Sequence, residues 1–266
     1  MTRPDPLDLW EQASQDLLAV LRDLGDDDWD RPALPGWTVQ DVLAHLAHLE
    51  SEVAGMPQPD GGRVDVEAAA NQPMPTDITE AGVVARRGRS AATLLDEFEI
   101  ACARRQEALA GLDLSDPKAL APGFAGVLGW DLGTWLRNRP IDLWVHEQDI
   151  RRATGRALTT TGVGAAHVAG IMTRAFPVAL RRLPVGTAVV AEISGPQGRV
   201  LAARVGDDGR AAPFDPSEGS DVTLAMDDAT WLLLTGGRID PEQADVQVTG
   251  DEGIAQVVLG RLNVTP

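Results

Sequence analysis

Residues 38–54, TVQDVLAHLAHLESEVA, have the spacing of an amphipathic helix that begins at a capped residue. Thr38, with Asp41 three residues later, is typical of a capping box. The apolar residues recur at helical spacing and so form one stripe that faces a core: Val39, Val42, Leu43, Leu46, Leu49 and Val53. Two of the chain's four histidines, His45 and His48, lie on this helix, which raises the question of whether either serves a site.

Other segments of the first half have the same helical period. They cover residues 5–25, a stretch from about Asp77 or Ser90 to Leu109, and residues 131–155, where Pro140 predicts a kink. Between the second and third segments, the prolines and glycines of residues 56–76 predict a long loop.

The pattern changes from about residue 156. One more helix is expected over residues 162–183, and strand-like pieces with turns between them follow at 187–194, 199–206, 221–227 and 244–250. Short helices are expected at 228–236 and 253–262. The predicted fold class is therefore α plus α+β, with a four-helix bundle over residues 1–156 and a smaller α+β domain over residues 157–266.

Composition restricts the partners. The net charge is −17 and no basic patch is evident, so phosphate backbones and anionic lipid surfaces would be repelled. We therefore expect a small-molecule ligand and neither nucleic acid nor membrane as a partner. The N-terminus has no apolar segment behind a basic start, so a cytoplasmic protein is expected, as a monomer or a homodimer.

Cys102 is the single cysteine, which excludes an internal disulfide. It lies on an apolar helical stripe, where it is expected to be a small buried side chain. A reaction that needs a thiol would then take that thiol from outside the chain.

Histidines and a carboxylate are spaced to share helix faces. Asp142 and His146 are four residues apart, and His45 and His48 are three apart. Bundle cores assemble metal sites from facing helices, and two histidines with one carboxylate leave a metal ion with open positions. Such spacings also occur by chance in many helices, so structural roles remain open.

Two segments carry a family resemblance: residues 34–50, LPGWTVQDVLAHLAHLE, and residues 137–155, RNRPIDLWVHEQDIRRATG. They resemble the signatures of the actinobacterial mycothiol-dependent maleylpyruvate isomerase family, which belongs to the DinB-like metal-binding four-helix proteins. The resemblance implies His45 as the first metal ligand, and it aligns Arg139, Asp142, His146 and Asp149 with the second signature. Residues 230–240 and 246–266 look like the family's C-terminal domain, which is similar to sterol carrier protein type two.

The resemblance implies a divalent metal, with zinc expected, held by His45, Asp142 and His146. It also implies mycothiol as the thiol cofactor, and isomerase or S-transferase chemistry on a small electrophilic, acidic substrate. Arg238 is a candidate catalytic residue that would contact this substrate or the thiol, against the alternative of a solvated turn residue. A non-catalytic metal- or ligand-binding module and a thiol-independent zinc hydrolase are the competing interpretations.

One residue departs from the family pattern, which usually has Glu where this chain has Asp142. Either the Pro140 kink brings the shorter side chain inward, or it binds through water, or the metal is weakly held. His48 lies outside the matched positions and is expected at the rim of the site or in a structural role. Asp149 could support His146 or, as the favoured alternative, pair with Arg152.

Overall fold

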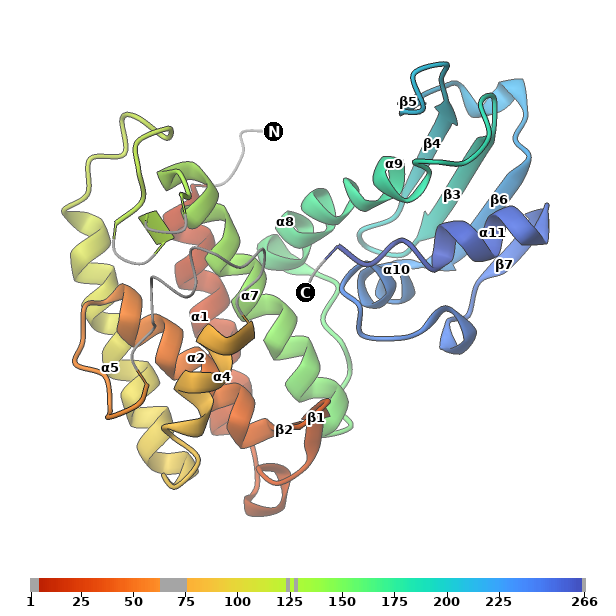
Figure 1. The fold of residues 1–266 in the computed structure, drawn as a ribbon. Coiled ribbons are helices and arrows are strands. Elements are labelled where there is room, and N and C mark those ends of the chain that lie inside the picture. Colours follow the sequence, from red (N-terminus) through yellow and green to blue (C-terminus); the bar gives the residue numbers. More distant parts are fainter. Residues whose placement is uncertain (1–4, 63–75, 123–124, 127–128, 265–266) are drawn as a thin grey trace. The chain divides into compact units, whose positions relative to one another are not determined.

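A computed structural model describes residues 5–62, 76–122, 125–126 and 129–264, so most of the loop expected at 56–76 lies outside the described residues. The chain forms two compact units, residues 1–158 and 159–266. Helices build the first unit, and a sheet with helices builds the second (Figure 1). The expected fold class is confirmed.

The first unit contains the expected helices, together with a small hairpin before α2 and a separate helix, α4, before α5. Its helices are α1 (Pro6–Arg22), α2 (Val39–Val53), α4 (Thr76–Val84), α5 (Ala91–Ala110) and α7 (Leu132–Ala153). A short 3-10 turn at Asp26–Asp28 and a small hairpin of β1 (Pro32–Leu34) and β2 (Trp37–Thr38) precede α2. Of the two starts expected for the third helix, Ser90 is the one that α5 has, because Ser90 caps α5 by accepting a hydrogen bond from the Thr93 backbone N–H. The residues from about Asp77 belong to a separate helix, α4.

Local capping fixes where the two site-bearing helices begin. The capping box of α2 is present: Thr38 Oγ1 accepts from the Asp41 N–H at 3.2 Å, and Asp41 Oδ2 accepts from the Thr38 N–H at 3.0 Å. Asp131 caps α7 by accepting from the Thr134 N–H at 2.7 Å. Pro140 lies inside α7, which runs as one helix from Leu132 to Ala153.

Helix α2 lies at the centre of the bundle and packs against α4, α5 and α7, while α1 packs on α7 and α5 (Figure 1). The apolar stripe of α2 is the inner surface: Val39, Val42, Leu43 and Leu46 are completely buried. Burial of this stripe fixes the rotation of α2, so the directions in which His45 and His48 point are set by the core.

The second unit begins with α8 (Gly162–Met172) and α9 (Ala175–Ala179), where one helix was expected. Pro177 accounts for the break, because its ring is incompatible with a continuous helix through residue 173. The strands are β3 (Ala188–Ser194), β4 (Arg199–Val205), β5 (Ala211–Pro213), β6 (Val222–Asp227) and β7 (Gln247–Gly250). The remaining helices are α10 (Asp228–Thr235), α11 (Glu252–Leu259) and short 3-10 turns at Pro216–Glu218 and Pro241–Gln243.

These strands form one sheet in the order β5-β4-β3-β6-β7, in which β3 and β6 are parallel and the other neighbours antiparallel. Strand β5 was not expected from the sequence. Helices α10 and α11 contact the sheet. Alternate residues of β6 are buried, whereas in β3 both faces are buried over Ala188–Ala191. No helix among the described residues is long and apolar enough to cross a membrane.

Candidate metal centre

His45, Asp142 and His146 come together between α2 and α7. Their possible ligand atoms all lie within 4.8 Å of one another. His45 Nε2 is 3.6 Å from Asp142 Oδ2, and His146 Nε2 is 3.6 Å from Asp142 Oδ1. The two imidazole rings meet edge to face, with centroids 4.8 Å apart. Residues about a hundred positions apart in the sequence thus converge on one point.

His45 is 3% exposed, and neither of its ring nitrogens has a hydrogen-bond partner among the described residues. Buried polar atoms are normally paired, so Nε2, which makes no hydrogen bond and lies 3.6 Å from the Asp142 carboxylate, is available to bind a ligand. Burial, only partly offset by Asp142, lowers the pKa of His45 and keeps the imidazole neutral, which is the form that binds a metal.

His146 is oriented by a carboxylate. Its Nδ1 lies 3.0 Å from Asp149 Oδ2, and Asp149 is completely buried. An ionised carboxylate only accepts, so Nδ1 carries the hydrogen and the lone pair of Nε2 faces Asp142. Asp149 therefore supports His146; Arg152, the partner favoured from the sequence, is exposed.

Asp142 lies closer to both histidines than its short side chain suggested. Burial disfavours its charge, but Arg139, His45 and His146 together outweigh burial and hold the pKa of the Asp142 carboxyl well below its usual range. Zinc–ligand bonds of 2.0–2.2 Å at tetrahedral angles place neighbouring ligand atoms about 3.4 Å apart. The observed 3.6 Å separations, from His45 Nε2 to Oδ2 and from His146 Nε2 to Oδ1, are close to this value and place the carboxylate between the two imidazoles.

A buried ionic network lies behind Asp142, and sequence reasoning missed two of its members. Arg139 joins Asp142 to Glu50 of α2, and Glu50 also pairs with Arg105 of α5. Glu50 and Arg105 are 0% and 1% exposed. Their positions in the sequence could have indicated them, because each is a charged residue on the apolar stripe of its helix. Glu50 follows Leu46 by four residues, and Arg105 follows Ala101 by four residues.

Trp37 forms one wall of the site and was also missed as a contributor. Its ring lies 5.2 Å from that of His45, centroid to centroid, and its Nε1 donates to Glu80 Oε2 of α4 at 2.8 Å. The small hairpin before α2 thus places an aromatic side chain against the first histidine.

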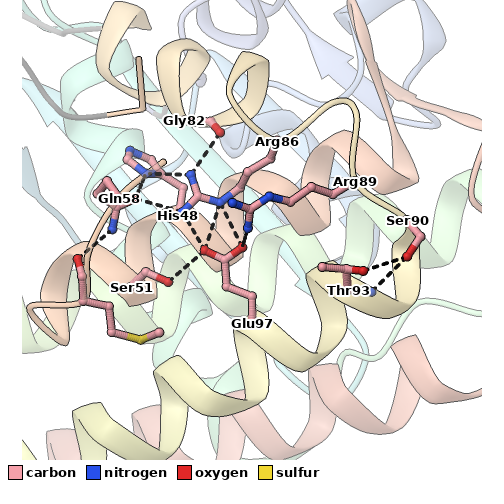
Figure 2. Close-up of polar contacts among 10 residues, drawn as sticks. His48, Ser51, Gln58, Gly82, Arg86, Arg89, Ser90, Thr93 and Glu97 are labelled. Atoms are coloured by element: carbon pink, nitrogen blue, oxygen red, sulfur yellow. Dashed lines mark hydrogen bonds and ion pairs between the residues drawn. The ribbon is translucent and has the colours of Figure 1, made fainter. Parts of the chain in front are cut away.

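His48 is not at a rim, so that expectation is wrong. It is completely buried, and its Nδ1 lies 3.1 Å from Gln58 Oε1 (Figure 2). Figure 2 shows the neighbouring Arg86 bound to Gln58 and to Glu97 of α5. A Cβ at Gly82 of α4 would come within 2.1 Å of the His48 ring, so this glycine allows α4 to pack directly on the histidine. His48 Nδ1 is thus bound within the bundle, whereas its Nε2 has no hydrogen-bond partner among the described residues.

Arg238 lies in the second unit, directly after α10. It is half-buried, its backbone N–H donates to the Leu233 carbonyl at 2.8 Å, and its Nη1 donates to the Gly236 carbonyl at 2.6 Å. These contacts hold the turn. Its catalytic role stays a prediction.

The fold and the site define a helical-bundle protein with an attached α+β unit and a two-histidine, one-carboxylate constellation of the kind that binds divalent metals. Residues 10–151 match the family described as the mycothiol maleylpyruvate isomerase N-terminal domain. The match covers more than half of the chain, and the chain belongs to this family.

Solved structures agree on the fold. The chain is similar to a crystal structure of the mycothiol-dependent maleylpyruvate isomerase, with a TM-score of 0.57 and 15% identity over 94% of this chain and 93% of that chain. A structure of a histidine-to-alanine mutant of that enzyme matches with the same TM-score and coverage at 14% identity. No curated protein matches the chain significantly.

Proposed function

We propose that the protein is a metal-dependent enzyme that uses mycothiol to isomerise, or to transfer the thiol to, a small electrophilic and acidic substrate. The observation that carries the proposal is the convergence of His45, Asp142 and His146, whose possible ligand atoms all lie within 4.8 Å of one another. Membership of the mycothiol maleylpyruvate isomerase family supports the thiol and the reaction class.

In this proposal His45, Asp142 and His146 hold one divalent ion, with zinc the expected metal. Two neutral imidazoles and one carboxylate offset only one of the ion's two charges, and three protein ligands leave a position open. When bound, such an ion would stabilise a thiolate, much as zinc acidifies a bound water.

The chain's own residues have defined tasks. Asp149 keeps the hydrogen of His146 on Nδ1 and so directs Nε2 towards the site. Arg139 keeps Asp142 ionised. Trp37 covers one side of His45 and limits water there. Arg238 is proposed to contact the acidic substrate or the thiol.

The thiol must come from outside the protein. Cys102 is 8% exposed, and burial, with the nearby Glu50 carboxylate, raises the pKa of its thiol far above the neutral range. The thiolate is the nucleophile, so this buried side chain is inert. A low-molecular-weight thiol such as mycothiol fills that role in the proposal.

The test uses the purified full chain. Elemental analysis at slightly alkaline pH is expected to give about one divalent metal per chain. The loaded protein should isomerise maleylpyruvate, or conjugate mycothiol to an electrophile, only when mycothiol is added. Absence of metal would favour a non-catalytic module, and hydrolytic activity without thiol would favour a zinc hydrolase; either result overturns the proposal.

A further inference from the structure

Arg139 bridges two carboxylates from different helices. Its Nη1 donates to Asp142 Oδ2 at 2.8 Å, while Nε and Nη2 donate to Glu50 Oε1 at 3.1 and 2.6 Å. The guanidinium is a rigid planar fork, so fixing two of its nitrogens on Glu50 fixes the direction of the third. The position of Asp142 Oδ2 is thereby linked to α2.

Glu50 is held in turn by Arg105. Arg105 Nη1 donates to Glu50 Oε2 at 2.5 Å, and its guanidinium lies over the rings of Trp10 and Trp135, 4.7 and 5.2 Å from their centroids. Two guanidinium groups and two carboxylates, those of Glu50 and Asp142, make the set electrically neutral. Each Glu50 oxygen has its own arginine, so this carboxylate is fixed in one orientation.

Stability by itself does not account for this network. Buried ionic groups are often no more stabilising than apolar residues of similar size, because desolvation offsets their attraction. Nε and Nη2 of Arg105 also have no hydrogen-bond partner among the described residues. The network ends, however, on one oxygen of Asp142, and the other oxygen lies 3.6 Å from His146 Nε2.

We propose that Arg139 is a positioning residue for the metal ligand Asp142, and that Glu50 and Arg105 hold Arg139 in place. Arg139 binds Oδ2, and with Oδ2 held 3.6 Å from His45 Nε2 the other oxygen, Oδ1, is held 3.6 Å from His146 Nε2, so the carboxylate stays between the two histidines. This inference rests on the proposed metal function. If Arg139 acted only as a nearby positive charge, removing it would strengthen binding of a cation. A positioning role predicts the opposite, a weaker binding of the metal ion.

Arg139→Lys separates geometry from charge, because lysine keeps the cation but cannot bridge both carboxylates. Arg86→Lys is the matched control: Arg86 is also completely buried between α4 and α5, and it is paired with Glu97. Zinc affinity is measured for the full chain by competition with a chromophoric chelator, and the visible spectrum of the cobalt-loaded protein reports the coordination geometry.

Arg139→Lys should lower zinc affinity about ten- to a hundredfold, the usual effect of losing an outer partner of a ligand, and should alter the cobalt spectrum. Arg86→Lys should change affinity less than about twofold, since the hydrogen bonds of Arg86 go to His48, Gly82, Gln58 and Glu97 and to none of the three proposed ligands. Unchanged or higher affinity in Arg139→Lys, with an unchanged spectrum, overturns the inference while the metal function stands. A wild-type chain that binds no metal overturns both.

Glu50→Gln provides a second measurement that does not depend on the folding of Arg139→Lys. Glutamine keeps the size of the side chain but offers one acceptor oxygen where two arginines need acceptors. Affinity should fall about tenfold and the cobalt spectrum should shift in the same direction. Wild-type affinity in a folded Glu50→Gln variant overturns the positioning role of this network.

Discussion

Two faces of α2 each have a buried histidine close to an arginine and a glutamate, but the polar groups on the two faces are paired differently. On the face towards α7, His45 lies beside Asp142 and His146, with Glu50 and Arg139 behind them. On the face towards α4, His48 lies beside Gln58, Arg86 and Glu97 (Figure 2). Each face has a buried histidine and a buried arginine paired with a glutamate.

The difference is in what the polar atoms have left to bind. Around His48 the amide, guanidinium and carboxylate groups bind one another: Arg86 donates to Gly82, Gln58 and Glu97, although Nε2 of the histidine ring has no hydrogen-bond partner among the described residues. Around His45 the network ends on a carboxylate that faces two imidazole nitrogens. A polar cluster whose atoms pair internally holds helices together, whereas one that converges unpaired donor atoms on a point can bind an ion.

The largest expected effect tests this assignment directly. His45→Ala or His146→Ala removes one of three proposed ligands and should reduce zinc affinity by several orders of magnitude. His48→Ala should leave the affinity within about twofold, because additivity holds for residues that share no partner. Competitive zinc titration of the three variants is the measurement, and loss of metal in His48→Ala with retention in His45→Ala would reverse the comparison.

Removing the carboxylate on the α4 side should damage stability instead. Glu97→Ala leaves the completely buried Arg86 without its ion pair, which costs about 3–5 kcal/mol of unfolding free energy. Glu99→Ala on the same helix breaks a largely exposed pair with Arg22 and should cost at most about 1 kcal/mol. Urea unfolding of the metal-free proteins measures the loss of unfolding free energy in each variant. Equal losses in the two variants would contradict a structural role for the Arg86–Glu97 ion pair.

A smaller effect is expected from the residue that orients His146. Asp149→Asn keeps the shape but weakens the acceptor of the His146 Nδ1 hydrogen, so zinc affinity should fall about ten- to a hundredfold. Glu147→Gln is the neighbouring control, since Glu147 is equally buried but pairs with Arg151. Matching affinities in the two variants would show that Asp149 does not support the ligand.

The smallest effect is a pH dependence assigned to His48. Burial, with the Arg86 cation opposing protonation and Gln58 favouring it, lowers the pKa of His48 from 6.5 to about 4. The unfolded chain binds this proton near pH 6.5, so the stability contribution is present above that pH and is lost as the pH falls towards 4.

The comparison of wild type with His48→Gln isolates this contribution from those of other groups. Between pH 7.5 and 5.5, metal-free wild type should lose about 1.4 kcal/mol more unfolding free energy than the variant. This is the free energy of protonating the unfolded histidine at a pH about one unit below its pKa. Denaturant unfolding at the two pH values measures this difference. Parallel losses in both proteins would mean that His48 protonates freely in the folded state.

Much of the fold and of the site can be predicted from local sequence. The capping box at Thr38, the apolar stripe of α2 and the change from helical to strand-like patterns near residue 156 are properties of short segments. For this reason the helical bundle and the α+β part were predicted correctly. The spacing of Asp142 and His146, together with the family signatures, predicted three metal ligands. The structure places these residues, His45, Asp142 and His146, close together.

Contacts between distant segments were beyond local reasoning. The extra strand β5 and the pairing of Glu50 with Arg139 and Arg105 depend on neighbours from other segments of the chain. Burial of a charged side chain is tolerated only when its partners are supplied by packing, and no single segment contains those partners.

The sequence by itself determined that His45 and His48 share a helix and lie about 60° apart around it, since each residue advances the helix by 100°. Only the tertiary structure decided what each histidine meets. Packing of the α2 stripe turned His45 to the carboxylate of Asp142 on α7, and it turned His48 to Gly82 on α4, where the missing Cβ leaves room for the ring. Helical periodicity fixes angles within an element, whereas the neighbour at each angle is chosen by how the whole core closes.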